Sequence, residues 1–256
     1  MHPLICPNLP QAAVGAVLLG TQAGPAATEQ LERFFHIEVV TVPPVKGLLA
    51  ATGSHAELQF FHLGGWDAVF YQSNDSVGAW AIRLKEMGFR LSPSSLSVTG
   101  DYPGDIALDA ARVGRYLLCL PRHTDPLILA RCRCDGISVL AVQQGYAKCS
   151  VCVADDHSLI TADPGIAAVA GASGMDVCRI RPGYIYLDGI HTGFIGGCTG
   201  KLGPGCMGVV GRLANHPDAV RIVRFLAARN IRVCELDNGP LRVVGGILPL
   251  VEAESN

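Results

Sequence analysis

The most constraining feature of this sequence is a recurring distance between a proline and the start of an apolar segment. Eleven residues separate the two in three places, from Pro25 to His36, from Pro126 to Ile137 and from Pro164 to Met175. Proline is favoured in the first turn of a helix, because an N–H there would have no intrahelical partner. The segments that follow are rich in β-branched and apolar residues, which favour strands. The spacing therefore predicts a helix–strand pair that recurs along the chain.

Two further copies vary this distance. Pro217 opens a longer helical pattern that leads to a strand at Ile231, and Ser76–Gly88 lacks the proline but leads to a strand at Phe89. Residues that tolerate a left-handed backbone end four of the helical patterns, as expected at a helix C-terminus; they are Gly88, Gly136, Gly174 and Asn230. We therefore predict five helix–strand pairs.

Strand-like segments also precede these helices, and we predict that they form hairpins. The predicted pairs are Leu58–Phe61 with Asp67–Tyr71, Ala107–Ala111 with Tyr116–Leu120, Cys149–Val153 with Ser158–Thr161, and Gly193–Cys198 with Met207–Gly211. Only Val14–Leu19 precedes the first helix, and the run Leu241–Val251 could supply its partner. Residues 1–256 are thus expected to form one α/β domain of about five strand–strand–helix–strand repeats, closed by pairing of the N- and C-terminal strands. The alternative is a single mixed α/β sheet with coincidental spacings.

Composition narrows the classes of function. Apolar residues make up 49% of the 256 residues and charged residues 16%, which is enough to bury a large core. A net charge of −2 with 6% aromatic residues does not favour nucleic acid or an anionic membrane as partner. No apolar run has the ~20 residues of a membrane span, and the first residues lack the pattern of a signal peptide. We therefore expect a cytoplasmic protein whose ten cysteines are reduced.

Cys149 and Cys152 form a C-x-x-C motif. On a strand, an offset of three places the two thiols on opposite faces, and no second pair completes a zinc site. A redox motif of this kind normally lies at a helix N-terminus. Neither a metal nor another cofactor is therefore predicted. Cys149 alone, beside Lys148, is a candidate nucleophile, and the alternative is a small buried apolar residue.

The repeat pattern resembles the pentein, or guanidino-group-modifying-enzyme, fold, a five-bladed α/β propeller. DYPGDIALDAARVG at 101–114, QGYAKCSVCVADDHSLITAD at 144–163 and GFIGGCTG at 193–200 resemble more closely an uncharacterised bacterial family of this fold. Catalytic penteins, such as arginine and agmatine deiminases and dimethylarginine hydrolases, act on guanidinium groups. The resemblance implies a central pocket with carboxylates, a histidine and a nucleophilic cysteine near the C-terminus.

Two parts of that pattern are missing. Gly245 and Gly246 are followed by Ile247, and no cysteine follows Cys234. The region that corresponds to the histidine motif reads YIYLDG, at 184–189. Standard deiminase chemistry is therefore not expected.

The resemblance also points to carboxylates. Asp101 and Asp105 flank a Tyr-Pro-Gly turn and resemble the acidic segment that enters one pentein blade. Paired carboxylates suit a guanidinium or ammonium ligand, although Asp105 could instead cap the turn. Asp109 lies four residues further on and could face the same side.

Two histidines and a glycine-rich segment complete the candidates. His55 and His191 lie in loop-like segments, where each could be a general base or simply solvated. The run Gly193–Gly205, which includes Gly197, is expected to be a long turn whose backbone approaches a neighbour or a ligand. The cluster at 155–157, Asp-Asp-His, is expected to be a hairpin turn.

These observations support three functions. The first is an enzyme that acts on a C–N bond of a small guanidino or amine cation, held by Asp101 and Asp105, with Cys149 or His191 supplying the chemistry. Further candidate substrate contacts are Asp109, Lys148, His55 and Gly197. The second is a binding protein without catalysis. The third is a macromolecular-interaction role, for which the fold has precedent in a ribosome anti-association factor. The substrate and the oligomeric state stay open.

Overall fold

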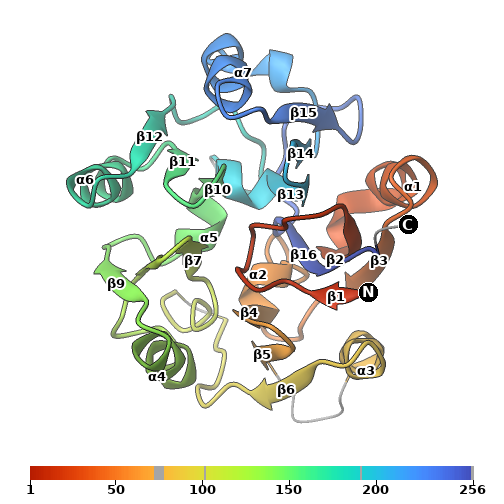
Figure 1. Cartoon of the computed structure of the whole chain (residues 1–256), viewed down its shortest axis with the longest axis vertical. Helices are drawn as coiled ribbons and strands as arrows, with labels where there is room; N and C mark the ends of the chain where they lie inside the picture. Colours follow the sequence, from red (N-terminus) through yellow and green to blue (C-terminus); the bar gives the residue numbers. More distant parts are fainter. Residues whose placement is uncertain (72–77, 101, 191, 255–256) are drawn as a thin grey trace.

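The computed structural model describes residues 1–71, 78–100, 102–190 and 192–254. Within these residues the strands form five small sheets. Figure 1 shows the sheets arranged around a common centre, with the longer helices on the outside. The mixed α/β class predicted from the repeat spacing is therefore confirmed, and a single mixed sheet is not observed in the described ranges.

Four of the sheets share one design. Their first two strands are antiparallel, and a helix then leads to a third strand that is parallel to the second. The elements, in chain order within each unit, are β4 (Phe60–Gly64), β5 (Asp67–Phe70), α3 (Ala79–Glu86) and β6 (Arg90–Pro93); β7 (Ala111–Val113), β8 (Tyr116–Cys119), α4 (Pro126–Cys134) and β9 (Ser138–Ala141); β10 (Cys152–Val153), β11 (Ser158–Thr161), α6 (Pro164–Ala172) and β12 (Asp176–Arg179); and β13 (Thr199–Gly203), β14 (Cys206–Val209), α7 (Ala219–Ala227) and β15 (Arg232–Glu235).

The remaining sheet joins segments from both ends of the chain. Its strand order is β1 (His2–Pro3), β16 (Ile247–Glu252), β2 (Val14–Gly20) and β3 (Glu38–Val42), and α1 (Gly24–Phe34) connects β2 to β3. Strand β16 is antiparallel to β2, with Ile247 opposite Leu19. The predicted pairing of the C-terminal run with the first strand is therefore confirmed (Figure 1).

The predicted start and stop signals lie at the ends of the helices. Pro126 and Pro164 are the first residues of α4 and α6, and the preceding aspartates accept hydrogen bonds from backbone N–H groups of the first turn. Such caps stabilise a helix by about 1 kcal/mol. Four residues that follow helices have positive φ, as predicted; they are Gly88 (108°), Gly136 (67°), Gly174 (84°) and Asn230 (57°).

The first strand of several units begins later than predicted. Three short helices occupy residues that were predicted to be strand or to lie just before one; they are α2 (Ala56–Gln59), α5 (Ala147–Ser150) and η2 (Ile195–Cys198). Residues 107–110 are likewise outside β7, which begins at Ala111. Every residue of the three short helices is buried. A short buried helical turn and a buried strand have similar apolar patterns, so periodicity did not separate them.

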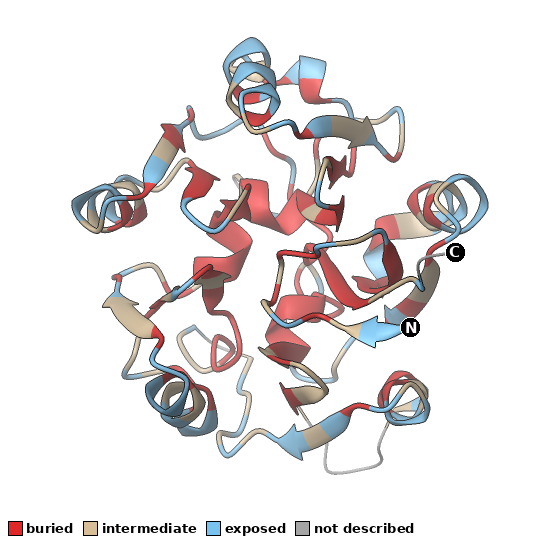
Figure 2. Ribbon diagram, in the orientation of Figure 1, coloured by how far each residue is buried: buried red, intermediate tan, exposed pale blue. Residues whose placement is uncertain are grey.

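Buried side chains concentrate at the centre of the molecule and on the inner sides of the outer helices (Figure 2). One apolar cluster at the centre includes Cys149, Ile195, Cys198 and Val243. None of the described helices combines the length and the apolar character that a membrane crossing requires.

Cysteine pairing departs in part from the prediction. A disulfide links Cys206 on β14 with Cys234 on β15, so the expectation of reduced thiols is wrong for this pair. These strands are parallel neighbours, which brings the two side chains together. The other eight cysteines, all among the described residues, are free thiols.

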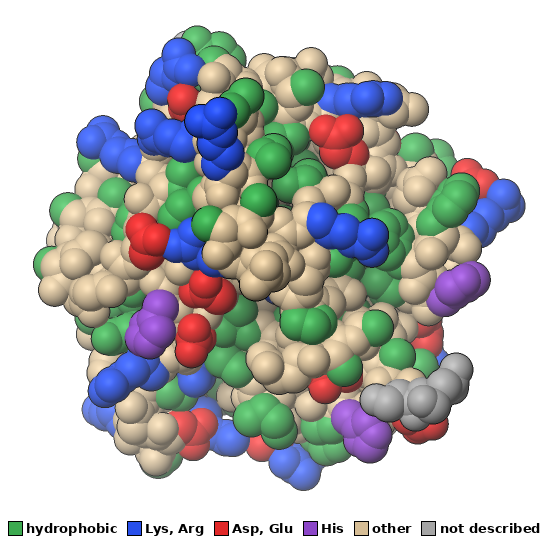
Figure 3. Space-filling view, turned by 45° about the horizontal axis from the view of Figure 1, so that its top comes forward, with side chains coloured by type: hydrophobic (Ala, Val, Ile, Leu, Met, Phe, Trp, Pro, Cys, Tyr) green, Lys and Arg blue, Asp and Glu red, His purple; other side chains and the backbone are tan. Residues whose placement is uncertain are grey.

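On the molecular face in Figure 3, basic side chains gather at the upper left, while acidic and basic side chains are interspersed elsewhere. Several charged side chains of the protein form ion pairs between neighbouring elements. Arg83 of α3 pairs with Glu38 of β3 at 2.7 Å, and Arg131 of α4 pairs with Asp67 of β5 at 3.0 Å. Charged groups thus link neighbouring units around the outside.

Candidate functional site

The candidate site lies at the centre, where the segments that precede the first strands meet. The backbone N–H groups of Val244 and Gly246 both donate to the carbonyl oxygen of Gly197, each at 2.8 Å. The backbone N–H of Lys148 donates to Asp109 Oδ1 at 2.6 Å. These bonds join η2 to the segment at 243–246, and α5 to the turn at 105–110.

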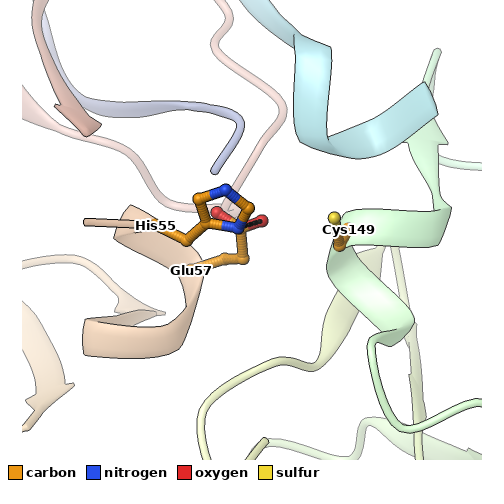
Figure 4. A group of neighbouring side chains, drawn as sticks. All are labelled: His55, Glu57 and Cys149. Carbon is orange, nitrogen blue, oxygen red and sulfur yellow. Dashed lines mark ion pairs between the residues drawn. The ribbon is translucent and has the colours of Figure 1, made fainter. Parts of the chain in front are cut away.

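A histidine, a carboxylate and a thiol converge there (Figure 4). His55 caps the N-terminus of α2, Glu57 lies on α2, and Cys149 lies on α5. Their nitrogen, oxygen and sulfur atoms all lie within 4.8 Å of one another, and His55 Nδ1 is 3.8 Å from Glu57 Oε1. The exposed fractions are only 2%, 1% and 4%, so all three groups are removed from bulk water.

Two glycines leave space for these side chains. A Cβ on Gly197 would lie 2.7 Å from Cys149 Sγ. A Cβ on Gly245 would lie 2.4 Å from the Cα of His55 and 2.8 Å from Glu57 Oε2, and Gly245 also has a φ of +86°. Glycine adopts positive φ without the steric penalty of a side chain. The approach of the terminal segment and η2 to the site thus depends on glycine.

Asp109 positions the helical turn that carries the thiol. Its Oδ1 accepts hydrogen bonds from the backbone N–H groups of Lys148 (2.6 Å) and Cys149 (3.2 Å), while its Oδ2 has no hydrogen-bond partner. Burial and the negative charge of Glu57 raise the pKa of Asp109 well above its usual value, although the two amides act in the opposite direction. One oxygen of the carboxyl group therefore holds α5 in place, and the other has no hydrogen-bond partner among the described residues.

The Cys149 thiol is protonated in this environment. Burial raises its pKa well above the usual value, and the charges of Glu57 and Asp109 add to that effect, while Lys148 opposes it. Burial also lowers the pKa of His55, against a smaller raising effect of Glu57. A neutral thiol thus lies beside a neutral imidazole, and both pKa shifts oppose proton transfer between them in the ligand-free protein.

Asp105 lies beside an aromatic wall. Its Oδ2 accepts a hydrogen bond from the Tyr146 hydroxyl at 2.6 Å. The Tyr146 ring lies 5.5 Å from the ring of Tyr102 and 6.5 Å from that of Phe194, measured between centroids. Burial and the hydrogen bond to Asp105 raise the pKa of Tyr146. Half-exposed Tyr102 connects this wall to the surface.

Two small cavities flank Lys148. One, of about 20 Å³, is lined by residues that include Glu57, Lys148 and Asn8. The other, of about 10 Å³, is lined by residues that include Lys148, Lys201 and Thr199. Each volume corresponds to roughly one water molecule. Lys148 therefore adjoins both cavities, and Glu57 adjoins the larger one.

Most of the residues selected from the sequence meet at this centre. The converging segments carry five of them: Cys149, Lys148, His55, Asp109 and Gly197. Asp105 accepts a hydrogen bond from Tyr146, which lies just before α5. Two other candidates, Asp101 and His191, fall outside the described residues. The roles assigned to all of these residues stay predictions.

Two details differ from the sequence analysis. Cys149 lies on the short helix α5 and not on a strand. Cys152 does lie on a strand, β10, as predicted, with its Sγ 3.9 Å from Met207 Sδ. Glu57 was not selected, although a carboxylate inside the apolar segment GSHAELQFF, at 53–61, is a signal for function because such groups are rarely buried.

The predicted hairpin turn at 155–157 is present between β10 and β11, where Asp155 Oδ1 accepts a hydrogen bond from the backbone N–H of His157 at 2.9 Å. The prediction of one long turn at Gly193–Gly205 is wrong, because this run contains η2 (Ile195–Cys198) and strand β13 (Thr199–Gly203). Its backbone was also expected to come close to a neighbour. A Cβ on Gly196 would lie 2.3 Å from the carbonyl oxygen of Lys148, which confirms that expectation.

Sequence comparison places most of the chain in one family. The model of a family described as "Family of unknown function (DUF6873)" matches residues 19–248. Among curated proteins, no sequence matches at a significant level.

The fold is similar to solved structures of guanidino-group-modifying enzymes. An inosamine-phosphate amidinotransferase from Streptomyces griseus superposes with a TM-score of 0.57 at 12% identity, covering 99% of this chain and 98% of that one. An amidinotransferase of the saxitoxin biosynthetic pathway from Microseira wollei gives 0.54 at 12% identity, with 96% and 97% covered. An agmatine deiminase from C. jejuni, solved with substrate bound, gives 0.52 at 9% identity, with 100% and 98% covered. The resemblance to the pentein fold is therefore confirmed.

Proposed function

The chain belongs to this family of unknown function, and we propose that it binds a small guanidino or amine cation at its centre and cleaves one of the cation's C–N bonds. We further propose that residues 1–256 form one closed five-bladed α/β propeller. The shared design of the sheets, the pairing of β16 with β2 and the similarity to solved pentein structures support this. A cytoplasmic location is part of the proposal, supported by the eight free thiols.

The observation that carries the proposal is a set of buried carboxylate oxygens without partners. Neither oxygen of Glu57 receives a well-formed hydrogen bond from the described residues, and Asp109 Oδ2 receives none. Leaving a buried polar group unpaired costs about 1–3 kcal/mol, and more when the group is charged. A planar guanidinium offers several N–H donors and a positive charge, so it would satisfy these oxygens with charge-assisted hydrogen bonds.

The chemistry follows from the side chains beside that ligand. Burial raises the pKa of the Cys149 thiol, and the charges of Glu57 and Asp109 add to that effect. A bound cation would offset the contribution of these charges and so ease transfer of the Cys149 proton to neutral His55. The sulfur would then form a bond to the guanidinium carbon. The C–N bond would break as the leaving amine takes the proton from His55. Water, or an acceptor amine, would release the product by attack on the same carbon and restore the thiol.

Binding without catalysis is the second candidate. The deep burial of Cys149 and the raised pKa of its thiol favour it, since the resting group is a poor nucleophile. The macromolecular-interaction role has less support, because the net charge of −2 and the 6% of aromatic residues do not favour nucleic acid as partner.

Thermal unfolding and product release together test the proposal. Agmatine and arginine, at 100 times their dissociation constants, are expected to stabilise the protein by about 2.7 kcal/mol, or roughly 5–10 °C. Citrulline, which has a neutral ureido group, is the ligand control. Glu57→Gln should abolish the shift, while the surface variant Glu29→Gln should retain it.

The outcomes separate the candidates. Release of ammonia or amine from agmatine by the wild type, but not by Cys149→Ser, would support the enzyme. A cation-dependent shift without turnover would support the binding protein. The absence of a shift with every cation, or a shift that Glu57→Gln leaves intact, would refute both.

A further inference from the structure

We infer that His55, Glu57 and Cys149 together bind a divalent transition-metal ion, and that Zn²⁺ suits the site best. The inference goes beyond the proposed reaction, because it concerns a second occupant of the same centre. It is independent of whether a guanidino compound binds or reacts.

The three donors match zinc in kind and in position. Thiolate sulfur, imidazole nitrogen and carboxylate oxygen are the ligands that zinc takes in proteins. Tetrahedral geometry with Zn–S of about 2.3 Å and Zn–N and Zn–O of about 2.0 Å places donor atoms ~3.3–3.6 Å apart. The donors here lie within 4.8 Å of one another, and His55 Nδ1 is 3.8 Å from Glu57 Oε1. Side-chain adjustments of about 1 Å would therefore complete the coordination.

A second observation also indicates a missing ligand. Both oxygens of Glu57 are buried and receive no well-formed hydrogen bond from the described residues. Buried polar groups in native proteins are nearly always satisfied, so these two oxygens call for an explanation. A guanidinium ion would satisfy them with N–H donors. A metal ion would satisfy them by coordination and would also bind the nearby nitrogen and sulfur atoms.

The charges of the site also favour a dication. Glu57 and a Cys149 thiolate would carry two formal negative charges. A divalent ion offsets both, which removes the cost of uncompensated negative charge in a low-dielectric interior.

Metal binding and thiol chemistry exclude each other at this site. Coordination uses a sulfur lone pair of Cys149 and releases the thiol proton to solvent. The metal-bound form therefore has no free thiol with which to attack a carbon atom. Loading with Zn²⁺ would hold the protein in a second, chemically inert state.

Titration with Co²⁺, which has visible spectral bands, tests the inference without any activity assay. Protein first treated with EDTA, with exposed Cys134 replaced by serine, is expected to bind one Co²⁺ per chain. A thiolate-to-cobalt charge-transfer band and the intense d–d bands of a tetrahedral site should appear together. Zn²⁺ should displace the cobalt one for one, and each metal bound should release about one proton.

Variants assign the ligands. Cys149→Ser should lose the charge-transfer band, while Cys198→Ser, which alters an equally buried cysteine of the same core, should keep it. His55→Ala and Glu57→Gln should weaken Co²⁺ binding by at least about 10-fold, the smallest loss usual for a disturbed metal site. Circular dichroism of each variant would verify that it is folded.

Three results would overturn the inference: no saturable band, a band that persists in Cys149→Ser, or equal loss of the band in folded Cys198→Ser. Binding of agmatine is measured separately, in EDTA. Cobalt binding without agmatine binding would uphold the metal site and refute the proposed function, and the converse would do the opposite.

Discussion

Replacing Gly197 by alanine is expected to destabilise the protein through the contact between η2 and α5. A Cβ at this position would lie 2.7 Å from Cys149 Sγ and 2.6 Å from Val243 Cγ1, both in the buried core. Carbon–carbon contacts at optimal separation are about 3.5–4.0 Å apart, so both neighbours would have to move by roughly 1 Å. Overpacking of this kind typically lowers the free energy of unfolding by about 1–3 kcal/mol.

Urea-induced unfolding would measure that loss, with Gly171→Ala as the matched control. Gly171 lies within α6, and a Cβ there would meet nothing within 4 Å. Alanine is favoured over glycine in a helix, so the control should gain about 0.5–1 kcal/mol. Adding Cys149→Ala to Gly197→Ala should recover part of the loss, because it removes the sulfur that the new methyl group meets. This account of the contact would be refuted if Gly197→Ala left the free energy of unfolding unchanged. It would also be refuted if adding Cys149→Ala recovered none of the lost free energy.

Two further predictions concern buried polar groups. Asp109→Ala should lower the free energy of unfolding by about 2 kcal/mol or more, because it leaves two buried N–H groups without an acceptor. Asp109→Asn keeps an acceptor and should lower the free energy of unfolding less. Equal losses for the two variants in urea unfolding would contradict this account. Burial lowers the pKa of His62 to about 4, and its Nδ1 accepts a hydrogen bond from the Gly64 N–H, so the folded protein binds fewer protons than the unfolded chain between pH 4 and about pH 6.5. The contribution of His62 to the free energy of unfolding should therefore be fully present above pH 6.5 and fall by up to about 3 kcal/mol on acidification to pH 4. His62→Phe should flatten this pH dependence of stability. An unchanged slope in the variant would exclude His62 as its source.

The sequence was most informative where local chemistry decides structure. Proline at the start and glycine or asparagine at the end bounded the outer helices, because these residues fix φ or tolerate positive φ whatever their surroundings. The pairing of the two ends followed from counting strands, since one hairpin lacked its partner. The helix boundaries depend on a few neighbouring residues and the pairing of the ends on a count of strands, so a single sequence is sufficient to predict both.

The centre was harder to predict, because its geometry depends on contacts between distant segments. The short helices α2 and α5 are too brief to show a helical period, and they exist because neighbouring inner segments pack closely against them. Glu57 was missed for the same reason. Its significance comes from the approach of Gly245 and Cys149, which are far away in the chain and bring no local pattern with them.

The location of the thiol bears on the missing terminal cysteine. The C-terminal segment still reaches the centre, where a Cβ on Gly246 would lie 3.4 Å from Lys148 Nζ. Inner segments of several units meet there, so a side chain absent from one segment can be supplied by another. Cys149 on α5 occupies that space opposite His55 and Glu57 (Figure 4). The absence of a cysteine after Gly246 therefore does not remove a thiol from the centre; it changes which unit supplies it.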